Sequence, residues 1–334
     1  MANWLQKQWL TFTLWHLLLL PISCLFSIVV TLRRLLYKVG FFRSYRLNVP
    51  VVIVGNINVG GAGKTPLVIW LAEQLKQAGY KPGIISRGYG SSLIGVASVS
   101  PDSVASTVGD EPVLIAMRTA CPVFVGAKRV EVGLALLKMH PECDIIISDD
   151  GLQHYALQRD VELVVFDGMK GFGNGALLPA GPLREPIGRL NTVDLLVRNG
   201  AQADTNQIIT PLPIEMQLKA SAFYNLNNRE LALGPAAFAG KSITAIAGIG
   251  NPERFFRQLS TMGLHFKCKA YNDHYQYSAQ DFEDVETDII LMTEKDAVKC
   301  TSFARPNFWV LPVNADIDKQ LLTNILSKLD KLRN

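Results

Sequence analysis

Short apolar runs alternate with amphipathic stretches along most of the chain. The runs are rich in β-branched residues and have the length of buried strands, and the stretches between them place apolar residues at helical spacing. Because short strands joined by helices pack into parallel sheets, the pattern predicts an α/β fold with a doubly wound, mostly parallel sheet. The expected strands are 51–55, 83–86, 122–125, 144–148, 162–166 and 194–197, with helices at 67–78, 111–119 and 128–140.

The alternation starts again after a polar stretch at 201–209. A strictly alternating strand begins at Ile214, a strand, glycine turn and helix follow within 242–263, and a further apolar strand covers 288–293. We therefore expect a first domain over 33–200 and a second, smaller α/β domain over 201–334.

The amino-terminal residues 1–32 depart from this pattern. Residues 10–32 carry no formal charge, and as a helix they would reach ~35 Å, enough to cross a hydrocarbon core of roughly 30 Å. No small-x-small cleavage site follows, and Pro21 stands where a lipoprotein signal ending at Cys24 needs an aliphatic residue. We predict a membrane-anchoring segment, and Pro21 leaves both a spanning helix and a shallow helical hairpin open.

Basic residues are concentrated after this segment. Before it stand only Lys7 and the amino terminus. The basic residues that follow it are Arg33, Arg34, Lys38, Arg43 and Arg46. The positive-inside rule therefore places the rest of the chain at the cytoplasmic face of the inner membrane, where ATP is available.

Composition restricts the function classes further. The net charge of +4 is too small to indicate nucleic-acid binding by itself. The five cysteines form no CxxC pair, which fits a reducing compartment and argues against a disulfide framework and a zinc site.

The stretch VVIVGNINVGGAGKTP, residues 51–66, nearly matches the phosphate-binding pattern G-x-x-x-x-G-K-[ST]. Asn58 stands where the pattern has its first glycine, and asparagine tolerates left-handed backbone angles better than other side chains. We therefore expect a P-loop NTPase-type fold, with Lys64 neutralising the β- and γ-phosphates of ATP and Thr65 holding Mg²⁺. The expected nucleotide-binding residues are Asn58, Gly60, Gly61, Ala62, Gly63, Lys64, Thr65 and Pro66.

Two acids end the apolar strand DIIISDD. Asp149 and Asp150 come where a carboxylate beside the phosphates would orient Mg²⁺ and its waters. We expect them to share this role with Thr65 and Glu111.

Two function classes remain open at this point. A partitioning ATPase would carry a signature lysine where this chain has Val59, and GTPase base-reading motifs are absent, TEKD at 293–296 being the nearest imitation. The candidates are a membrane-anchored kinase and a membrane-tethered P-loop ATPase that acts as a switch on a protein partner.

Eight motifs occur in order over roughly residues 50–300, and together they resemble the tetraacyldisaccharide 4′-kinase family, the bacterial lipid A 4′-kinases. They are GNINVGGAGKTP, ISRGYG, GDEP, DDGLQH, LPAGPLREP, AGIGNP, NDHY and TEKDAVK. The resemblance implies transfer of the ATP γ-phosphate to the 4′-hydroxyl of a tetraacylated glucosamine disaccharide 1-phosphate, giving lipid IVA. It also implies a glycolipid substrate and contact with inner-membrane lipids, with no nucleic acid and no obligate protein partner.

The resemblance also implies roles for individual residues. Asp110 of GDEP is the general base and His274 of NDHY is its partner, so the second domain must close over the first. From its position alone, Asp110 could equally be a first-turn acid of a helix. TEKDAVK would frame the nucleotide from the second domain. The implied contacts with the phosphorylated disaccharide are Arg87, Tyr89, Arg129, Gln153 and His154, where arginine suits the 1-phosphate because guanidinium binds phosphate bidentately.

Overall fold

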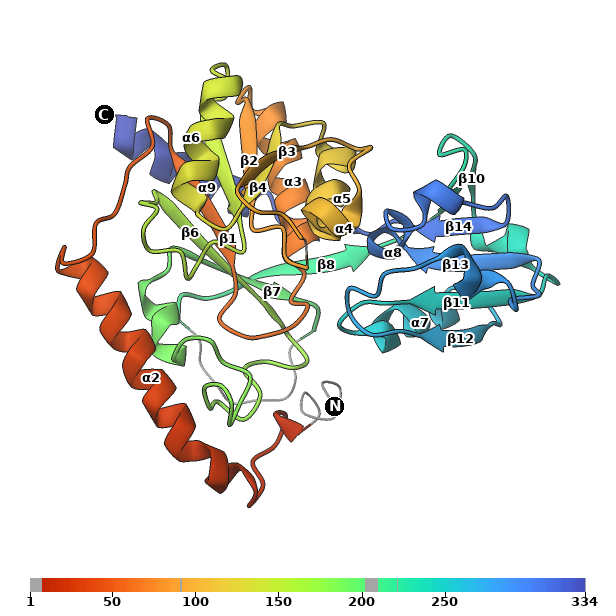
Figure 1. The fold of residues 1–334 in the computed structure, drawn as a ribbon, viewed down its shortest axis with the longest axis horizontal. Helices are drawn as coiled ribbons and strands as arrows, with labels where there is room; N and C mark the ends of the chain where they lie inside the picture. The colour runs from red at the N-terminus through yellow and green to blue at the C-terminus, as the bar shows by residue number, and fades with distance from the viewer. Residues whose placement is uncertain (1–7, 91, 202–209, 221, 334) are drawn as a thin grey trace.

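Two β-sheets carry the fold in the part of the chain that the computed structural model describes, residues 8–90, 92–201, 210–220 and 222–333 (Figure 1). The larger sheet has the described strand order β15-β8-β7-β6-β1-β5-β2-β4-β3. From β8 to β4 every pair is parallel, and only the edge strands β15 and β3 pair antiparallel. The expected doubly wound, mostly parallel sheet is confirmed. Its strands are β1 Val51–Gly55, β2 Pro82–Ser86, β3 Val96–Val99, β4 Val123–Gly126, β5 Ile145–Asp149, β6 Val161–Asp167, β7 Leu195–Asn199, β8 Ile214–Lys219 and β15 Asn314–Ile317.

Helices cover both faces of this sheet. Val52 and Val54 of β1 pack into one hydrophobic cluster together with residues of α3, α5 and α9, whereas Val51 and Ile53 pack into a second cluster together with residues of α6. Since successive side chains of a strand point to opposite faces, a fully buried strand such as β1 must be apolar throughout, as its sequence is. The helices are α3 Lys64–Gln77, α4 Ala105–Val108, α5 Asp110–Thr119, α6 Arg129–Met139 and α9 Gln320–Arg333, with the 3-10 turn η1 Ile187–Thr192.

The smaller sheet has the described strand order β10-β9-β14-β13-β11-β12 and two hydrophobic clusters of its own. It supports the glycine turn and helix α7 that the sequence predicted after the strand at 242. Its strands are β9 Phe223–Asn225, β10 Ala232–Leu233, β11 Ile243–Ala247, β12 Lys267–Ala270, β13 Ile289–Thr293 and β14 Phe308–Leu311, and its helices are η2 Pro235–Phe238, α7 Pro252–Thr261, η3 Ala279–Phe282, α8 Glu294–Ala297 and η4 Thr301–Phe303.

The smaller sheet is inserted between two neighbouring strands of the larger one. The strand expected from Ile214 in the second domain is β8, which pairs with β7, and β15 returns to pair with β8. Helix α9 then packs into the same cluster as α3. The sheets therefore do not follow the expected boundary at residue 201, because β8 finds its hydrogen-bond partner in the larger sheet. We propose instead a second unit between β8 and β15; residues 202–209 lie outside the described residues.

Helix α2, His16–Lys38, lies along one side of the larger sheet's unit (Figure 1). It continues through Pro21 without a break, so the hairpin that Pro21 left open does not form. Mid-helix, the Ser23 hydroxyl donates to the Leu177 carbonyl at 2.8 Å, while Leu18 and Leu25 are more than half exposed. Among the described residues, α2 alone has the length and composition to cross a membrane. It extends beyond the predicted end at residue 32 and includes the basic residues Arg33, Arg34 and Lys38.

Candidate active site

The glycine-rich loop joins β1 to the first turn of α3. Gly63 precedes Lys64 with φ +97°, and a Cβ at this position would lie 2.4 Å from Asn199 Nδ2. That amide, at the end of β7, donates to the Ala62 carbonyl at 3.0 Å. Gly63 is therefore required both by its backbone angle and by the side chain that fixes the loop.

The prediction that Asn58 replaces glycine because it adopts left-handed backbone angles is wrong. The described non-glycine residues with positive φ are Ala120, Asp150 and His274, so Asn58 does not occupy left-handed backbone. Asn58 instead pairs with Leu183 in an isolated antiparallel bridge, which requires extended backbone. Its amide donates to the Gly171 carbonyl at 2.9 Å, so the side chain ties the segment around residue 171 to the loop rather than facing a phosphate.

A cavity of about 630 Å³ lies between the two sheets. The loop from Val59 to Pro66 forms one wall, and α7, the loop at 273–274 and the start of α8 form the opposite wall. Of the residues that the sequence singled out, the cavity is lined by Gly60, Gly61, Ala62, Gly63, Lys64, Thr65, Pro66, Tyr89, Glu111, Asp150 and His274. It is not lined by Asn58, Arg87, Asp110, Arg129, Asp149, Gln153 or His154.

Asp150 stands at the centre of a cluster of charges. Lys64 Nζ lies 3.5 Å from its Oδ1, and Arg184 Nη1 donates to both carboxylate oxygens at 3.1 Å. Burial alone would raise the pKa of Asp150, but Lys64 and Arg184 outweigh it and lower the pKa to about 2. Arg184 belongs to the LPAGPLREP motif but was not singled out from the sequence. Its only signal there is the charged pair Arg184-Glu185 at the end of an apolar, proline-rich stretch.

Asp149 is buried beside this cluster. Ser86 Oγ donates to its Oδ2 at 2.9 Å, while Oδ1 has no hydrogen-bond partner among the described residues. Burial and the neighbouring Glu111 and Asp150 carboxylates raise the pKa of Asp149 to about 7. An unpartnered buried oxygen between acidic neighbours fits a divalent cation. No group of three or more His, Cys, Asp or Glu side chains within the described ranges could hold a metal ion, so a cation at Asp149 would need phosphate or water oxygens to complete its coordination.

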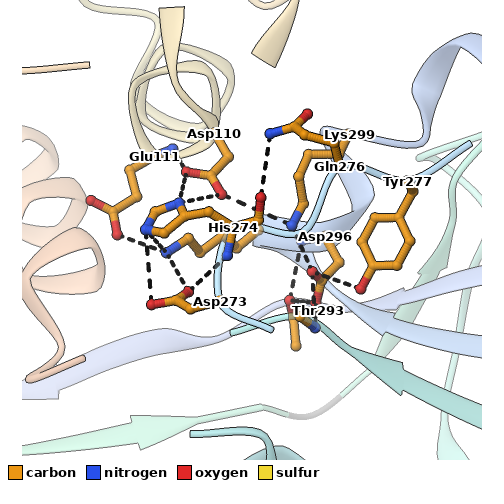
Figure 2. Close-up of polar contacts among 11 residues, drawn as sticks. Asp110, Glu111, Asp273, His274, Gln276, Tyr277, Thr293, Asp296 and Lys299 are labelled. Atoms are coloured by element: carbon orange, nitrogen blue, oxygen red, sulfur yellow. Dashed lines mark hydrogen bonds and ion pairs between the residues drawn. The ribbon is translucent and has the colours of Figure 1, made fainter. Parts of the chain in front are cut away.

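Asp110, which is buried at the start of α5 and is not part of the cavity lining, forms a hydrogen-bonded pair with His274, which lines the cavity (Figure 2). His274 Nδ1 lies 3.1 and 3.0 Å from the two Asp110 carboxylate oxygens. Burial opposes the charge on both groups, yet the hydrogen bond between them gives a net lowering of the Asp110 pKa and a net raising of the His274 pKa. Asp110 Oδ1 also accepts from the Glu111 backbone N–H at 2.8 Å. Asp110 is thus both a first-turn acid of α5 and the partner of His274.

The segment 293–299 contributes charged residues that the sequence did not assign individually. Glu294 accepts two hydrogen bonds from Arg118 Nη1, at 2.7 and 2.8 Å. Lys295 Nζ lies 3.0 Å from Glu111 Oε1, and Lys299 Nζ lies 3.9 Å from Asp110 Oδ2. All three partners belong to α5, so α8 and the residues after it dock on that helix by ion pairs. Alternating charges at helical spacing in TEKDAVK are the signal that could have indicated this contact.

Two of the expected lipid contacts lie near the cavity mouth. Arg87 is exposed, and the exposed Tyr89 ring has its centroid 5.1 Å from that of His274. Both residues follow β2, whose carboxyl end meets the P-loop edge of the parallel sheet.

Of the other three expected lipid contacts, Arg129 and Gln153 donate hydrogen bonds within the protein, and His154 is half-buried. Arg129 was expected to bind a lipid phosphate, but it is buried and donates to the Gly126 and Asp149 carbonyls at 2.8 and 3.2 Å. Burial lowers the pKa of Arg129 to about 10. Gln153 Nε2 donates to the Asn56 carbonyl and to Glu185. For His154, burial lowers the pKa to about 3, and Arg129 and Arg87 add to the effect.

Known proteins with similar sequences and structures share a description. The family model described as "LpxK: Tetraacyldisaccharide-1-P 4'-kinase" matches residues 15–330. The chain is 51% identical over 331 residues to a tetraacyldisaccharide 4′-kinase of Methylobacillus flagellatus, covering 99% of this chain and 97% of that protein. It is 48% identical over 336 residues to the enzyme of that name from Pasteurella multocida, covering 100% and 99%. A crystal structure of LpxK from Aquifex aeolicus in complex with ATP superposes with a TM-score of 0.80 at 29% identity, covering 95% of this chain and 99% of that one.

Proposed function

Because the chain belongs to the tetraacyldisaccharide-1-P 4′-kinase family, we propose that its cavity brings ATP and the glycolipid together for phosphoryl transfer. The protein is a lipid A 4′-kinase, which phosphorylates the 4′-hydroxyl of tetraacyldisaccharide 1-phosphate to give lipid IVA. The alternative of a P-loop ATPase switch is not favoured, since the matching relatives are kinases.

One observation supports the assignment of the reacting groups. Lys64 of the phosphate loop and His274, which is hydrogen-bonded to the buried Asp110, line the same cavity from its two walls. A sugar hydroxyl is a weak nucleophile, so transfer needs phosphate positioning, charge neutralisation and a proton acceptor. These residues provide all three.

ATP binds with its phosphates on the loop 59–66 and the amino end of α3. The loop N–H groups and the helix dipole favour anions there, and Lys64 leaves Asp150 to contact the β- and γ-phosphates. Thr65, Glu111, Asp149 and Asp150 would hold Mg²⁺, which when bound would offset the charge of the phosphate oxygens.

The Asp110 carboxylate accepts the proton of the 4′-hydroxyl while that oxygen attacks the γ-phosphorus and ADP leaves. His274 donates a hydrogen bond from Nδ1 to Asp110 and orients the carboxylate. Asp110 is buried, which shields its carboxylate from bulk water.

The glycolipid enters from the side of α2 and the mouth marked by Arg87 and Tyr89. Exposed apolar residues of α2 embed in the cytoplasmic face of the inner membrane and keep the active site near its lipid substrate. Because Ser23 in the middle of α2 bonds to Leu177 of the protein body, we favour a helix lying along the membrane surface over one that spans it.

Incubation with γ-labelled ATP and the disaccharide 1-phosphate tests the assignment. We expect the label to enter the lipid with the native chain and not with Lys64→Ala. ATP hydrolysis that needs no lipid and produces no labelled lipid would instead support the switch.

A further inference from the structure

His274 lies between two carboxylates that compete for its ring proton. Asp110 is 3.0 Å from Nδ1, and Asp273 Oδ2 is 3.8 Å from Nε2 (Figure 2). A neutral imidazole carries its one N–H either on Nδ1, at hydrogen-bond distance from Asp110, or on Nε2, on the side of Asp273. Only the form with the proton on Nδ1 supports Asp110.

Lys295 occupies the position that decides between the two carboxylates. Its Nζ lies 3.4 Å from His274 Nε2 and 3.3 Å from Asp273 Oδ1. An ammonium can only donate, so a hydrogen bond to Nε2 requires that nitrogen to be the acceptor and leaves the ring proton on Nδ1. The same ammonium offsets the charge of Asp273, which weakens the competing acceptor.

The surroundings hold the Lys295 ammonium in this place. Its side chain is only 17% exposed and is further fixed by Glu111 Oε1 at 3.0 Å. His274 has a left-handed backbone, φ +59°, and its N–H donates to Asp273 Oδ1 at 3.1 Å. The loop thereby brings the Asp273 carboxylate beside the ring of His274. The Lys295 ammonium offsets that carboxylate and keeps the His274 ring directed at Asp110.

We propose that Lys295 is a positioning residue for phosphoryl transfer: it screens Asp273, holds His274 with its proton on Nδ1, and so commits the ring to Asp110. The inference rests on the proposed role of the Asp110–His274 pair. If Lys295 instead bound the ATP phosphates directly, each of the following measurements would give a different result.

Steady-state kinetics of Lys295→Met test the coupling to His274. We expect kcat to fall about 10- to 100-fold, as for a misplaced catalytic group, with the KM for ATP changed less than about twofold. In a His274→Ala background the same change should cost less than about threefold, because the ring that Lys295 positions is gone. Multiplicative losses, or a large rise in the KM for ATP, would overturn the proposal.

Asp273 provides a rescue that phosphate binding would not predict. Asp273→Asn removes the competing carboxylate, so in the Lys295→Met background it should restore most of the lost kcat. Absence of rescue would count against the inference. Lys295→Arg, which keeps a cationic donor, should retain more activity than Lys295→Met, and Lys267→Met on the exposed edge strand β12 is the matched control for loss of a lysine.

Nitrogen-15 NMR of the imidazoles reports the tautomer itself. The chain has five histidines, and the signal that disappears in His274→Ala identifies the relevant ring. At a pH where the ring is neutral, we expect the Nδ1–H form in the native protein and a shift toward Nε2–H in Lys295→Met. An unchanged tautomer would overturn the inference alone, whereas full activity of His274→Ala would overturn the proposed pair itself.

Discussion

Asp110 receives hydrogen bonds from two sources, the Glu111 backbone and the His274 ring. Asparagine can accept the backbone bond as well as aspartate does, but it cannot take a proton. We therefore expect Asp110→Asn to leave the unfolding midpoint nearly unchanged while kcat falls by ~10²–10⁴. Near-normal turnover, measured with saturating ATP and lipid, would eliminate Asp110 as the base.

Pairing Asp110→Ala with His274→Ala tests whether the two residues act as a unit. Each single change should lower kcat strongly with little effect on ATP binding, and the double variant should be hardly worse than the poorer single one. Losses that multiply would show independent roles.

Lys64 and Thr65 begin α3 and face the cavity rather than the core. Their replacement by alanine would remove the proposed phosphate and Mg²⁺ contacts and little buried surface. Transfer of labelled phosphate should therefore cease in either variant while the circular dichroism spectrum stays native. Native-like activity in either variant would contradict the phosphate-loop assignment.

His154 makes stability depend on pH. In the folded chain burial holds its pKa at about 3, below the ordinary value of 6.5, so the unfolded state binds the extra proton between these values. Stability should thus fall as the pH drops below about 6.5. The free energy of unfolding can be measured by urea titration at about pH 7.5 and at about pH 5. On going from the higher to the lower pH, His154→Gln should lose about 1–2 kcal/mol less of this free energy than the native chain loses. Equal losses would show that another group is responsible.

At the scale of elements, α5 and α8 are joined by a buried ion pair. Glu294 is 4% exposed, Arg118 on α5 supplies two of its hydrogen bonds, and the Val313 backbone N–H supplies a third at 3.1 Å. Because removing one partner leaves an unpaired buried charge, Arg118→Leu should cost about 3–5 kcal/mol of stability in denaturant unfolding. Changing both residues to leucine should cost less than Arg118→Leu alone, and a larger cost would contradict this account.

The exposed apolar residues of α2 lie on the side of the helix opposite Ser23, which contacts the protein body through Leu177. Changing Leu18, Leu25 and Ile28 to serine removes apolar surface that could enter a bilayer and spares the Ser23–Leu177 hydrogen bond. We expect sedimentation with lipid vesicles to decrease strongly. Leu134→Ser on α6 replaces a comparably exposed leucine and should have no effect; undiminished sedimentation of the α2 variant would move the anchor elsewhere.

The elements that the sequence predicted well are those whose burial determines their pattern. The buried strand β1 and the helices α3 and α5 follow from apolar periodicity, because both faces of the sheet are covered. The edge strand β3 was not predicted, since its residues are largely exposed. Asn58 was interpreted by its backbone tolerance, but the bridge to Leu183 that decides its conformation lies 125 positions away in the chain.

At the scale of the whole molecule, the cavity depends on contacts between residues far apart in the chain. Asp110 and His274 are separated by 164 positions, and no local pattern indicates that they meet; their pairing followed from family resemblance. The Lys295 and Arg184 contacts depend on how the two sheets pack, which periodicity does not encode. Sequence reasoning therefore singled out the phosphate loop and the acids Glu111, Asp149 and Asp150, but not the basic residues Arg184 and Lys295 that pair with them.

The pairing of β8 with β15 has a consequence for exchanging the segment between these two strands among family members. Lys219 of β8 and Asn314 of β15 face each other in register, so residues 220–313 start and finish at adjacent points. Apart from Val298, every residue in the two clusters of the larger sheet comes from outside this stretch. The stretch is therefore an insertion whose two ends are held together by the antiparallel pair β8 and β15. A chimaera that takes it from another family member should fold with its joins at paired strand ends, and needs matched residues chiefly where α8 meets α5.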